Sequence, residues 1–315
     1  MSFTTEVKEE MSRIPAQCSH CDRALLSALV RIEGSLHVSG SGAYRLEVAT
    51  DGIFVARLII RLVHEIYHLK TEFTVRQSVL HKTQNYLIGV PAQPQLAESL
   101  ADLGVLTADG GMEFGIKPAI VAKQCCAAAY LRGAFLGSGF VASPRGDFHF
   151  EITVSGRELA DGLVDIMAER EIPAKIVQRR NAFVVYLKSG ESITDVLAMT
   201  GAHQAALRLE NERVYKSMRN DVNRKTNAEV ANQGKTVESA MKQVFAIRKV
   251  VDAYGMENLP VALQDYIRLR VTYPDASLAE LGERATPPLS KSAIAHRVRR
   301  IEQMAAEIDA SRSRS

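Results

Sequence analysis

The stretch Tyr130–Val141, YLRGAFLGSGFV, decides how the first two thirds of this chain is interpreted. It combines small and apolar residues with a Gly-Ser-Gly ending. Gly133 and Gly137 are one helical turn apart, so both fall on one face of a helix. Small residues at this spacing allow two helices to approach closely. The stretch therefore predicts a helix that packs tightly against another helix and is followed by a sharp turn.

A second copy of this pattern occurs 105 residues earlier, where Cys21–Val38, CDRALLSALVRIEGSLHV, aligns with Cys126–Ser143, CAAAYLRGAFLGSGFVAS. Each copy continues with alternating strand patterns, an amphipathic helix, two more strands and a short helix. We expect the amphipathic helices to begin after N-caps at Asp51 and Ser155. The repeat predicts an α+β domain with two αββαββα halves related by a pseudo-twofold axis. Each half would form a sheet with one free face, and two such faces suit duplex DNA.

The composition limits the class of protein but does not identify its function. The 315 residues are 46% hydrophobic and 24% charged, as in ordinary soluble proteins, and the formal net charge is only +3. An anionic partner must therefore be inferred from where the basic residues lie. The absence of Trp disfavours an aromatic platform for single-stranded bases. No signal sequence or membrane-spanning apolar run is present, so we expect a cytoplasmic protein.

The paired helix segments resemble the two motifs of the LAGLIDADG homing endonucleases. The resemblance rests on LSALVRIEG at Leu26–Gly34, on LRGAFLGSG at Leu131–Gly139 and on the αββαββα order. In that family each motif supplies a carboxylate at its eighth position, and the two acids hold divalent metal ions against the scissile phosphates. The matching positions here are Glu33 and Ser138. Because a neutral hydroxyl cannot replace a carboxylate as a metal anchor, the resemblance implies a vestigial site without catalytic residues.

The carboxyl third resembles the WhiA family of bacterial regulators, which combine a degenerate LAGLIDADG-type domain with a helix-turn-helix domain. The resemblance lies in the Asn- and Arg-rich segment NERVYKSMRNDVNRKTNAEVANQ and in the block SLAELGERATPPLSKSAIAHR, and it covers about residues 1–305. It implies a DNA-binding transcription regulator of sporulation or cell division that has no nuclease activity. The loss of the second acid agrees with this implication.

The residues of the carboxyl third also predict a helical bundle that contains a helix-turn-helix. Ser277 and Glu280 have the spacing of a capping box that opens a short helix, and Pro287 and Pro288 prevent this helix from continuing. The segment before the next helix is longer than the three or four residues of the tight form of the motif. Upstream, two amphipathic segments, one of which opens with Pro260 at its first helical position, would complete a bundle of about four helices.

The second helix of this motif begins after Ser290 and is the predicted recognition helix. Ile294, Val298 and Ile301 recur at helical spacing and form its apolar stripe. On the other faces, Arg or Lys can pair with guanine acceptors in the major groove, and hydroxyls can reach either base. The alternative is a basic solvated helix at a chain end. The predicted DNA-binding residues of this helix are Ser290, Lys291, Ser292, His296, Arg297, Arg299 and Arg300.

We expect residues 201–235 to link an amino-terminal domain, residues 1–200, to a carboxyl-terminal domain, residues 236–315. The linker is rich in Asn and basic residues and has few large apolar residues, so it cannot form a core of its own. Two interpretations remain open: a hydrogen-bonded hinge, or a strip that grips the phosphate backbone beside the recognition helix. The residues that would carry the second role are Arg219, Asn223, Arg224 and Lys225.

Four cysteines stand near the starts of the paired helices. Cys18 and Cys21 form a CxxC, and Cys125 and Cys126 are adjacent in the sequence. Cysteines at helix starts commonly serve as small buried apolar groups, and on that basis we expect no cofactor. The alternative is that four thiols ahead of two symmetry-related helices converge on Zn²⁺ or on an iron–sulfur cluster.

These patterns favour a sequence-specific regulator, a monomer with internal pseudosymmetry, that binds double-stranded DNA in the nucleoid through its helix-turn-helix. The amino-terminal domain would then be a scaffold, a secondary DNA surface, or a docking platform for another sporulation regulator or RNA polymerase. Two rival hypotheses remain. One is an active metal-dependent endonuclease that uses Glu33, and the other is a protein-interaction module whose amino-terminal domain never binds DNA.

Overall fold

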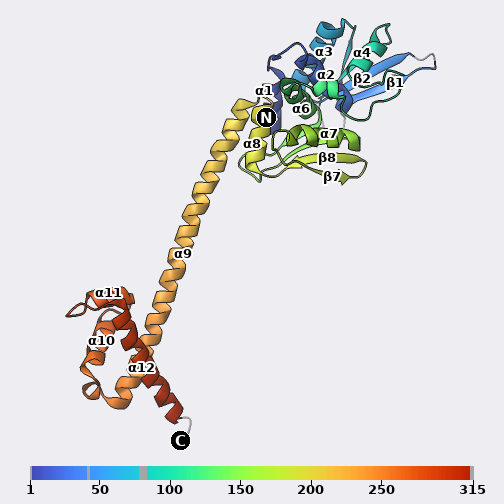
Figure 1. The fold of residues 1–315 in the computed structure, drawn as a ribbon. Helices are drawn as coiled ribbons and strands as arrows, with labels where there is room; N and C mark the ends of the chain where they lie inside the picture. Colours follow the sequence, from blue (N-terminus) through green and yellow to red (C-terminus); the bar gives the residue numbers. More distant parts are fainter. Residues whose placement is uncertain (1, 41–42, 78–83, 313–315) are drawn as a thin grey trace. The chain divides into compact units, whose positions relative to one another are not determined.

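The computed structural model describes residues 2–40, 43–77 and 84–312. The chain separates into two compact units, Met1–Lys216 and Ser217–Ser315. The first unit contains two α+β halves in the predicted order, and the second is a helical bundle (Figure 1). Helix α9 (His203–Tyr254) contains the boundary between the units, so the proposed linker has a helical form.

The first half follows a short amino-terminal helix, α1 (Phe3–Ser12). Its strands form an antiparallel sheet in the order β1-β2-β4-β3. The buried positions alternate along β2, where Leu46 and Val48 face the core. The elements of this half are α2 (Cys21–Glu33), β1 (Gly34–Val38), β2 (Tyr44–Thr50), α3 (Ile53–Tyr67), β3 (Glu72–Gln77), β4 (Gln84–Val90) and α4 (Leu96–Asp102).

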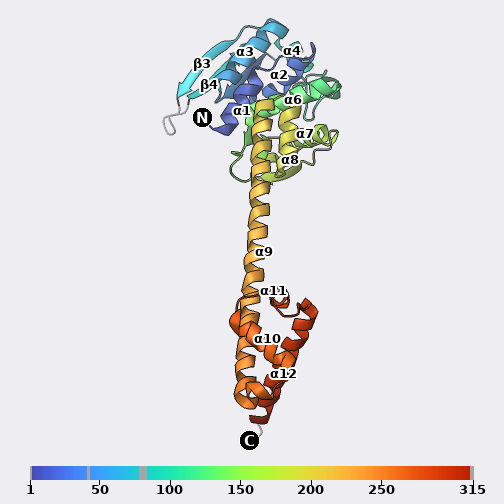
Figure 2. The ribbon, with the colours of Figure 1, turned by 90° about the vertical axis from the view of Figure 1, so that its left-hand side faces the viewer.

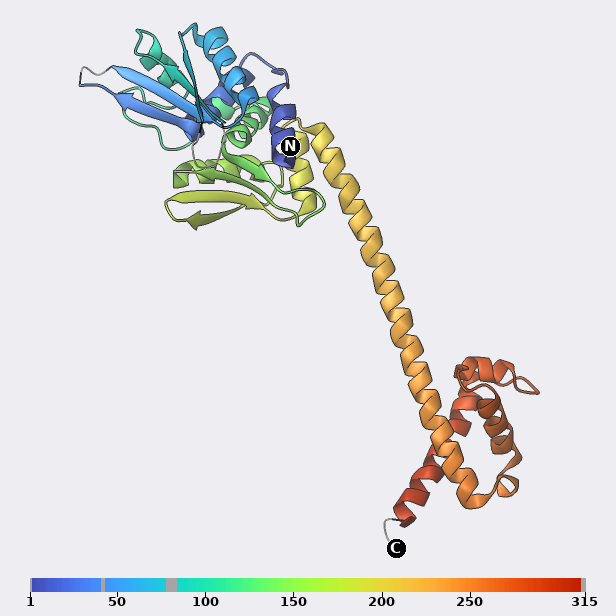
Figure 3. The ribbon, with the colours of Figure 1, turned by 180° about the vertical axis from the view of Figure 1, so that it is seen from behind.

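The second half repeats this arrangement, with strand order β5-β6-β8-β7. Figure 3 shows both sheets from behind, the first in blue and cyan and the second in green. A tight turn at Arg180-Asn181 joins the last two strands of this sheet, and Arg179 pairs with Ala182 across it. The elements are α5 (Pro118–Val121), α6 (Gln124–Ser138), β5 (Gly139–Val141), β6 (Phe150–Val154), α7 (Arg157–Ala168), β7 (Lys175–Arg179), β8 (Ala182–Leu187) and α8 (Gly190–Met199).

The N-caps of the two long helices were predicted one residue too early, at Asp51 and Ser155. The structure places Gly52 at the N-cap of α3 and Gly156 at the N-cap of α7, and neither can cap with a side chain. In the first half, the hydroxyl of Thr50 instead accepts a hydrogen bond from the Gly52 N–H at 3.3 Å. The carboxylate of Asp51 is thereby left to line a pocket beside the helix pair.

The contact between α2 and α6 is the centre of the first unit, as the repeat predicts. The helices run parallel, since Gly133 lies beside Leu25 and Gly137 lies beside Glu33. A Cβ atom on Gly133 would stand 2.4 Å from the Leu25 carbonyl oxygen and 2.9 Å from the Ala28 Cβ. Because a backbone carbonyl inside a helix cannot move aside, the helices can approach this closely only with glycine at position 133.

The second unit is built on the carboxyl-terminal part of α9 and three further helices (Figure 2). The predicted apolar stripe of Ile294, Val298 and Ile301 is buried in its core. Pro260 is the N-cap of the helix Val261–Thr272 rather than its first helical residue. Among the described helices, none combines the length and apolar character that a bilayer crossing requires. The elements after α9 are η1 (Met256–Asn258), α10 (Val261–Thr272), α11 (Leu278–Glu283) and α12 (Lys291–Arg312).

Replacing Gly133 by Ala should destabilise the first unit by about 2 kcal/mol, because the added methyl group overpacks the helix contact. For a unit of this size, we expect the melting temperature to fall by about 4–8 °C. Infrared spectroscopy of the amide I band of antiparallel sheet, recorded while the full chain is heated, would measure this change. Gly115→Ala is the matched control, since a Cβ there meets nothing within 4 Å. Equal melting temperatures for the two variants would contradict the role of Gly133.

Candidate functional site

The two vestigial positions lie at the carboxyl ends of the helix pair, Glu33 on α2 and Ser138 on α6. Both line one pocket. The Ser138 hydroxyl donates a hydrogen bond to the backbone carbonyl of Thr153 at 2.5 Å, so it is tied to strand β6 of its own sheet. The position that would hold the second acid is therefore occupied by a side chain with a structural partner. The pocket is lined by Lys8, Glu33, Ala49, Thr50, Asp51, Asn85, Gly137, Ser138 and Gly139.

Lys8 and Asp51 are the two charged residues of this pocket that the sequence did not indicate. The Lys8 ammonium donates a hydrogen bond to the Gly137 carbonyl at 2.8 Å. Burial lowers the pKa of Lys8, while the negative charges of Asp51 and Glu33 raise it. Burial also raises the pKa of Glu33, Lys8 lowers it, and Asp51 raises it. The pocket thus contains a cation supplied by the chain itself. Lys8 could not be found from the repeat, because α1 precedes the repeated elements.

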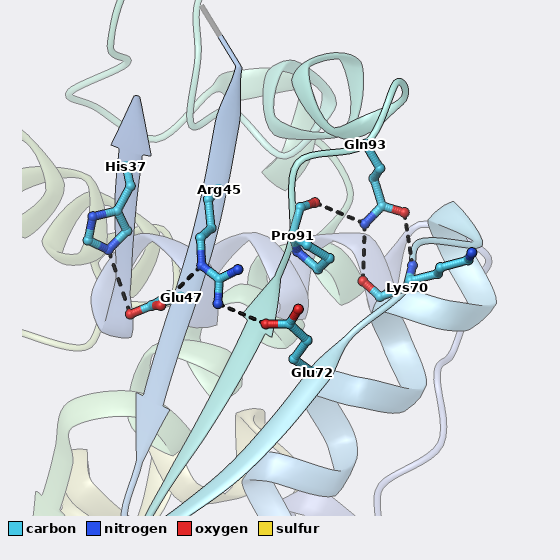
Figure 4. A network of polar contacts seen from close by, with 7 residues as sticks. All are labelled: His37, Arg45, Glu47, Lys70, Glu72, Pro91 and Gln93. Atoms are coloured by element: carbon cyan, nitrogen blue, oxygen red, sulfur yellow. Dashed lines mark hydrogen bonds and ion pairs between the residues drawn. The ribbon is translucent and has the colours of Figure 1, made fainter. Parts of the chain in front are cut away.

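The free face of the first sheet carries charges that are paired with one another (Figure 4). Arg45 on β2 donates to Glu47 at 3.2 Å and to Glu72 of β3 at 2.8 Å. These carboxylates raise the pKa of Arg45, chiefly through the hydrogen bond to Glu72. His37 Nε2 lies 3.7 Å from Glu47. Beyond the edge of this network, Gln93 bridges to the backbone of Lys70. Apart from Arg76 of β3, which is exposed on the same face, the basic side chains of this network are therefore paired with acids.

The second sheet has a similar acidic centre on its free face. Glu151 of β6 lies 2.9 Å from His149 Nε2 and 3.4 Å from the Arg179 guanidinium of β7. Phe140 and Val177, which share this face by register, are exposed. The two free faces that the repeat predicts are confirmed. Part of their charge is paired within each sheet, whereas Arg76 on β3 and Lys175 on β7 are exposed on these faces.

The helix-turn-helix of the second unit is formed by α11 and α12. The predicted capping box is confirmed, because Ser277 Oγ accepts from the Glu280 N–H while the Glu280 carboxylate accepts from the Ser277 N–H. After α11, the chain passes close to Gly282, whose carbonyl accepts from the Leu289 N–H at 2.9 Å. A Cβ on Gly282 would lie 2.3 Å from the Leu289 carbonyl oxygen, so this return of the chain needs glycine.

Arg270 on α10 holds the segment that precedes α11. It is fully buried at 1% exposure, and its Nη1 donates to the carbonyl oxygens of Ala276 at 2.6 Å and Pro274 at 3.2 Å. Charge-assisted hydrogen bonds of this kind fix the backbone strongly. This role could not be predicted from the sequence, because Arg268 and Arg270 lie in the same amphipathic segment and differ only in the helix face that they occupy.

The predicted recognition helix begins at Lys291, with Ser290 as its N-cap residue. Ser290 Oγ accepts a hydrogen bond from the Ala293 N–H at 3.2 Å. Ser290, Lys291, Ser292, His296, Arg299 and Arg300 are exposed, whereas Arg297 is half-buried at the flank of the helix. Within the described residues, the four cations of this helix from Lys291 to Arg300 form no ion pair. The structure therefore brings one exposed, basic face together at the amino-terminal end of α12.

The candidate residues of the proposed linker do not share one surface. All of them are exposed on α9. Arg219 and Asn223 are four residues apart and lie on one face, but Lys225 points to another side of the helix. Arg224 forms an ion pair with Asp221. The hypothesis that these residues form a continuous phosphate-binding strip therefore reduces to Arg219 and Asn223.

The four cysteines converge at the amino ends of the helix pair. Their sulfur atoms all lie within 4.8 Å of one another. Cys18 Sγ is 3.5 Å from that of Cys21, 3.6 Å from that of Cys125 and 3.7 Å from that of Cys126. A backbone hydrogen bond from His20 and the contact with Cys21 lower the pKa of Cys18 to about 6. Burial raises the pKa values of Cys21 and Cys126.

Replacing Lys8 by Met should destabilise the first unit more at pH 7 than near pH 4. Without Lys8, the pKa of Glu33 rises further above its unfolded value. A carboxyl with a raised pKa destabilises the fold at pH values above that pKa and has no such effect below the unfolded pKa. The lost hydrogen bond to Gly137 contributes equally at both pH values. Melting temperatures would measure the difference, with Lys175→Met, at an exposed position on β7, as control. An equal loss at both pH values would show that Lys8 does not act on Glu33.

Comparison with solved structures shows the fold of the chain. A crystal structure of full-length DUF199/WhiA from Thermatoga maritima matches with a TM-score of 0.60 and 23% identity, over 98% of this chain and 99% of that one. A structure of the N-terminal LAGLIDADG domain of DUF199/WhiA matches with a TM-score of 0.52 and 21% identity, over 64% of this chain and 90% of that one. The α+β domain with LAGLIDADG-like halves is thereby confirmed.

Comparison with sequences shows the family. The chain is similar to proteins named "Probable cell division protein WhiA" from Desulforamulus reducens, at 42% identity over 98% of this chain and 96% of the relative, and from Heliobacterium modesticaldum, at 42% identity over 97% and 96%. Three family profiles match: a WhiA N-terminal LAGLIDADG-like domain at residues 19–106, a WhiA LAGLIDADG-like domain at 127–219 and a WhiA C-terminal HTH domain at 222–305. This chain belongs to the WhiA family.

Proposed function

We propose that this protein is a non-catalytic transcription regulator that binds double-stranded DNA through α11 and α12. The observation that carries the proposal is the exposed amino-terminal end of α12, where basic and hydroxyl side chains surround a helix N-terminus. The partial positive charge of that end favours a phosphate, and side chains on the first turns can reach base edges in the major groove. The matched C-terminal HTH domain supports this use of the helix pair.

Regulation of cell division is the process that we propose for this regulator, because its relatives carry that name. Sporulation, which the family resemblance also suggests, is a narrower proposal on the same basis. We further propose a cytoplasmic location in contact with the nucleoid, since the partner is chromosomal DNA. The molecule would act as a monomer whose internal repeat takes the place of a second subunit.

For the amino-terminal domain, we propose the role of a scaffold that docks another protein, such as a regulator or RNA polymerase. Affinity for DNA depends on cations that neutralise phosphates. The free face of the first sheet instead holds Arg45 between Glu47 and Glu72. On the free face of the second sheet, Phe140 and Val177 are 45% and 36% exposed, and apolar groups of this kind suit a protein partner better than a phosphate backbone.

Replacing Arg299 or Lys291 by Ala should weaken binding to DNA fragments selected from genomic DNA by the full chain. We expect a loss of about tenfold for each, since one good contact to a base or phosphate is worth about 1–3 kcal/mol. For Lys291→Ala, the dependence of the affinity on salt concentration should also become weaker by about one phosphate contact. Fluorescence anisotropy titrations at several salt concentrations would measure both effects.

The matched control for these variants is Lys242→Ala, which removes one positive charge from α9 at a side chain already paired with Glu238. Its affinity should change less than twofold. Unchanged binding by both α12 variants would contradict the assignment of α12 as the recognition helix. In that case, the same titration with Arg219→Ala would test whether α9 carries the contact.

The proposed absence of nuclease activity rests on the pocket at the helix ends. A hydrolytic two-metal site needs several anionic oxygen ligands. Here the hydroxyl of Ser138 is bound to Thr153, and the Lys8 ammonium already provides a positive charge beside Glu33 and Asp51. A divalent cation would have to displace or repel that ammonium.

Supercoiled plasmid incubated with the protein and Mg²⁺ or Mn²⁺ should therefore remain supercoiled, at the level of a protein-free reaction. The Glu33→Gln and Asp51→Asn variants should behave in the same way. Gel electrophoresis of the plasmid separates nicked from supercoiled forms. Nicking by the wild-type protein that disappears in either variant would overturn the proposal and establish a metal-dependent nuclease.

A further inference from the structure

The cysteine cluster at the amino ends of α2 and α6 has the dimensions of a single-metal site. In a tetrahedral zinc site with four thiolates, each Zn–S bond is about 2.3 Å, so that neighbouring sulfur atoms are about 3.8 Å apart. The three separations measured from Cys18 are 3.5, 3.6 and 3.7 Å. All other separations in the cluster are at most 4.8 Å. The four sulfur atoms therefore already lie close enough together to share one ion.

The helix ends at the cluster favour negative charge, whereas burial favours the neutral thiols of Cys21 and Cys126. Cys21 is the first residue of α2, and Cys125 and Cys126 are the second and third residues of α6. The N–H groups of a first helical turn and the helix dipole stabilise thiolates, and here two helices supply them to one cluster. Such convergence is not needed for cysteines that act as small apolar groups.

A buried cation also stands next to the cluster. Arg132 on α6 is 6% exposed, and its Nε has no hydrogen-bond partner among the described residues. Burial lowers the pKa of Arg132, while negative charge on Cys21 and Asp22 raises it. A buried guanidinium is unfavourable unless an anion compensates it. Four thiolates around a divalent ion carry a net charge of about −2, which would add to the charge of Asp22 in compensating Arg132.

We propose that Cys18, Cys21, Cys125 and Cys126 together bind one Zn²⁺ ion as a structural tetrathiolate site. Binding releases the thiol protons to solvent and leaves the oxidation state of every sulfur unchanged. This proposal departs from the sequence-based expectation that the chain has no cofactor. The sequence left the site open, because the repeat allows the CxxC and the cysteine pair to converge but equally allows these cysteines to act as small buried apolar groups.

The positions of the four thiols fit a single bound ion better than an iron–sulfur cluster or a disulfide. In a [4Fe–4S] cluster each thiolate binds a different iron, so the sulfurs must stand further apart than when they share one ion. A disulfide needs an S–S distance of about 2.05 Å, and it would join only two of the four thiols. Tetrahedral sulfur ligation by one ion is the geometry typical of zinc.

The site would fasten the two halves of the first unit together. Cys18 and Cys21 belong to the first half, and Cys125 and Cys126 to the second. A metal that joins them closes a loop of about a hundred residues and restricts the unfolded chain, in the manner of a long-range disulfide. The ion would sit at the end of the helix pair opposite to Glu33 and Ser138, so this role is independent of the vestigial pocket and of DNA binding.

Elemental analysis of the full-length protein, purified under reducing conditions without chelators, should give about one zinc per chain. Metal-free protein to which Co²⁺ alone is added should develop the visible bands and the thiolate-to-metal charge-transfer absorption of tetrahedral cobalt. Zn²⁺ should then displace the cobalt and remove these bands. Removal of zinc should also lower the melting temperature of the sheets, and zinc alone should restore it.

Variants distinguish zinc binding by the thiols from a role of the thiols as small buried apolar groups. Cys18→Ser, at the half-exposed corner, should retain less than a tenth of the zinc, and its melting temperature should not respond to zinc. Ser19→Ala and His20→Ala, in the same turn, should keep the full zinc content, because neither side chain is a proposed ligand. If Cys18→Ser does not fold, the zinc content and cobalt spectrum of the wild-type protein decide alone.

Several results would overturn the proposal. One is wild-type protein without zinc and without tetrahedral cobalt bands. A second is stoichiometric iron and sulfide with the absorption of a cluster. A third is a mass loss of two hydrogen atoms per pair of cysteines in protein purified without oxygen, which would indicate disulfides. Full retention of zinc by Cys18→Ser would also contradict the assignment of the ligands.

Discussion

The close contact between α2 and α6 is the constraint on which the rest of the first unit depends. Gly133 brings α6 against the carbonyl of Leu25, and this contact fixes how far apart the two helices lie along their length. Because the helices run parallel, one contact sets the geometry at both of their ends. At the carboxyl ends it places Glu33 beside Gly137, and at the amino ends it brings two pairs of cysteines within 4.8 Å. Two very different sites therefore follow from a single packing requirement.

This dependence explains how the second acid of the paired motifs can be absent while the fold remains. Gly133 is needed for packing, so its loss would destabilise the unit. The side chain at position 138 faces no such demand, and Ser138 is accommodated by a hydrogen bond to Thr153. Lys8 then completes the pocket by compensating the charge of Glu33, which would otherwise be partly buried without a partner. A pocket of this kind is stable without any metal ion and needs no second acid.

The parts of the fold that could be predicted from the sequence are those encoded by local patterns, and most of them occur in two copies. The αββαββα order and its strands follow from periodicity over a few residues. The capping box of Ser277 and Glu280 is equally local. By contrast, Lys8 reaches the vestigial pocket from a helix outside the repeat, and Arg270 differs from Arg268 only in burial. Such residues are defined by contacts distant in sequence, which no local pattern reveals.

The two units differ in whether their basic side chains are paired with acids. A net charge of +3 over 315 residues does not identify a DNA-binding protein. The sheets of the first unit carry basic residues, but Arg45 and Arg179 are held by acids on the same faces. Within the described residues, Lys291, Arg299 and Arg300 of α12 are exposed and form no ion pair, near the amino end of that helix. Because phosphate binding depends on cations that are free to replace counterions, a few unpaired side chains on one helix outweigh a larger number of paired ones. The position of the charges, rather than their sum, therefore favours α12 as the surface that meets DNA.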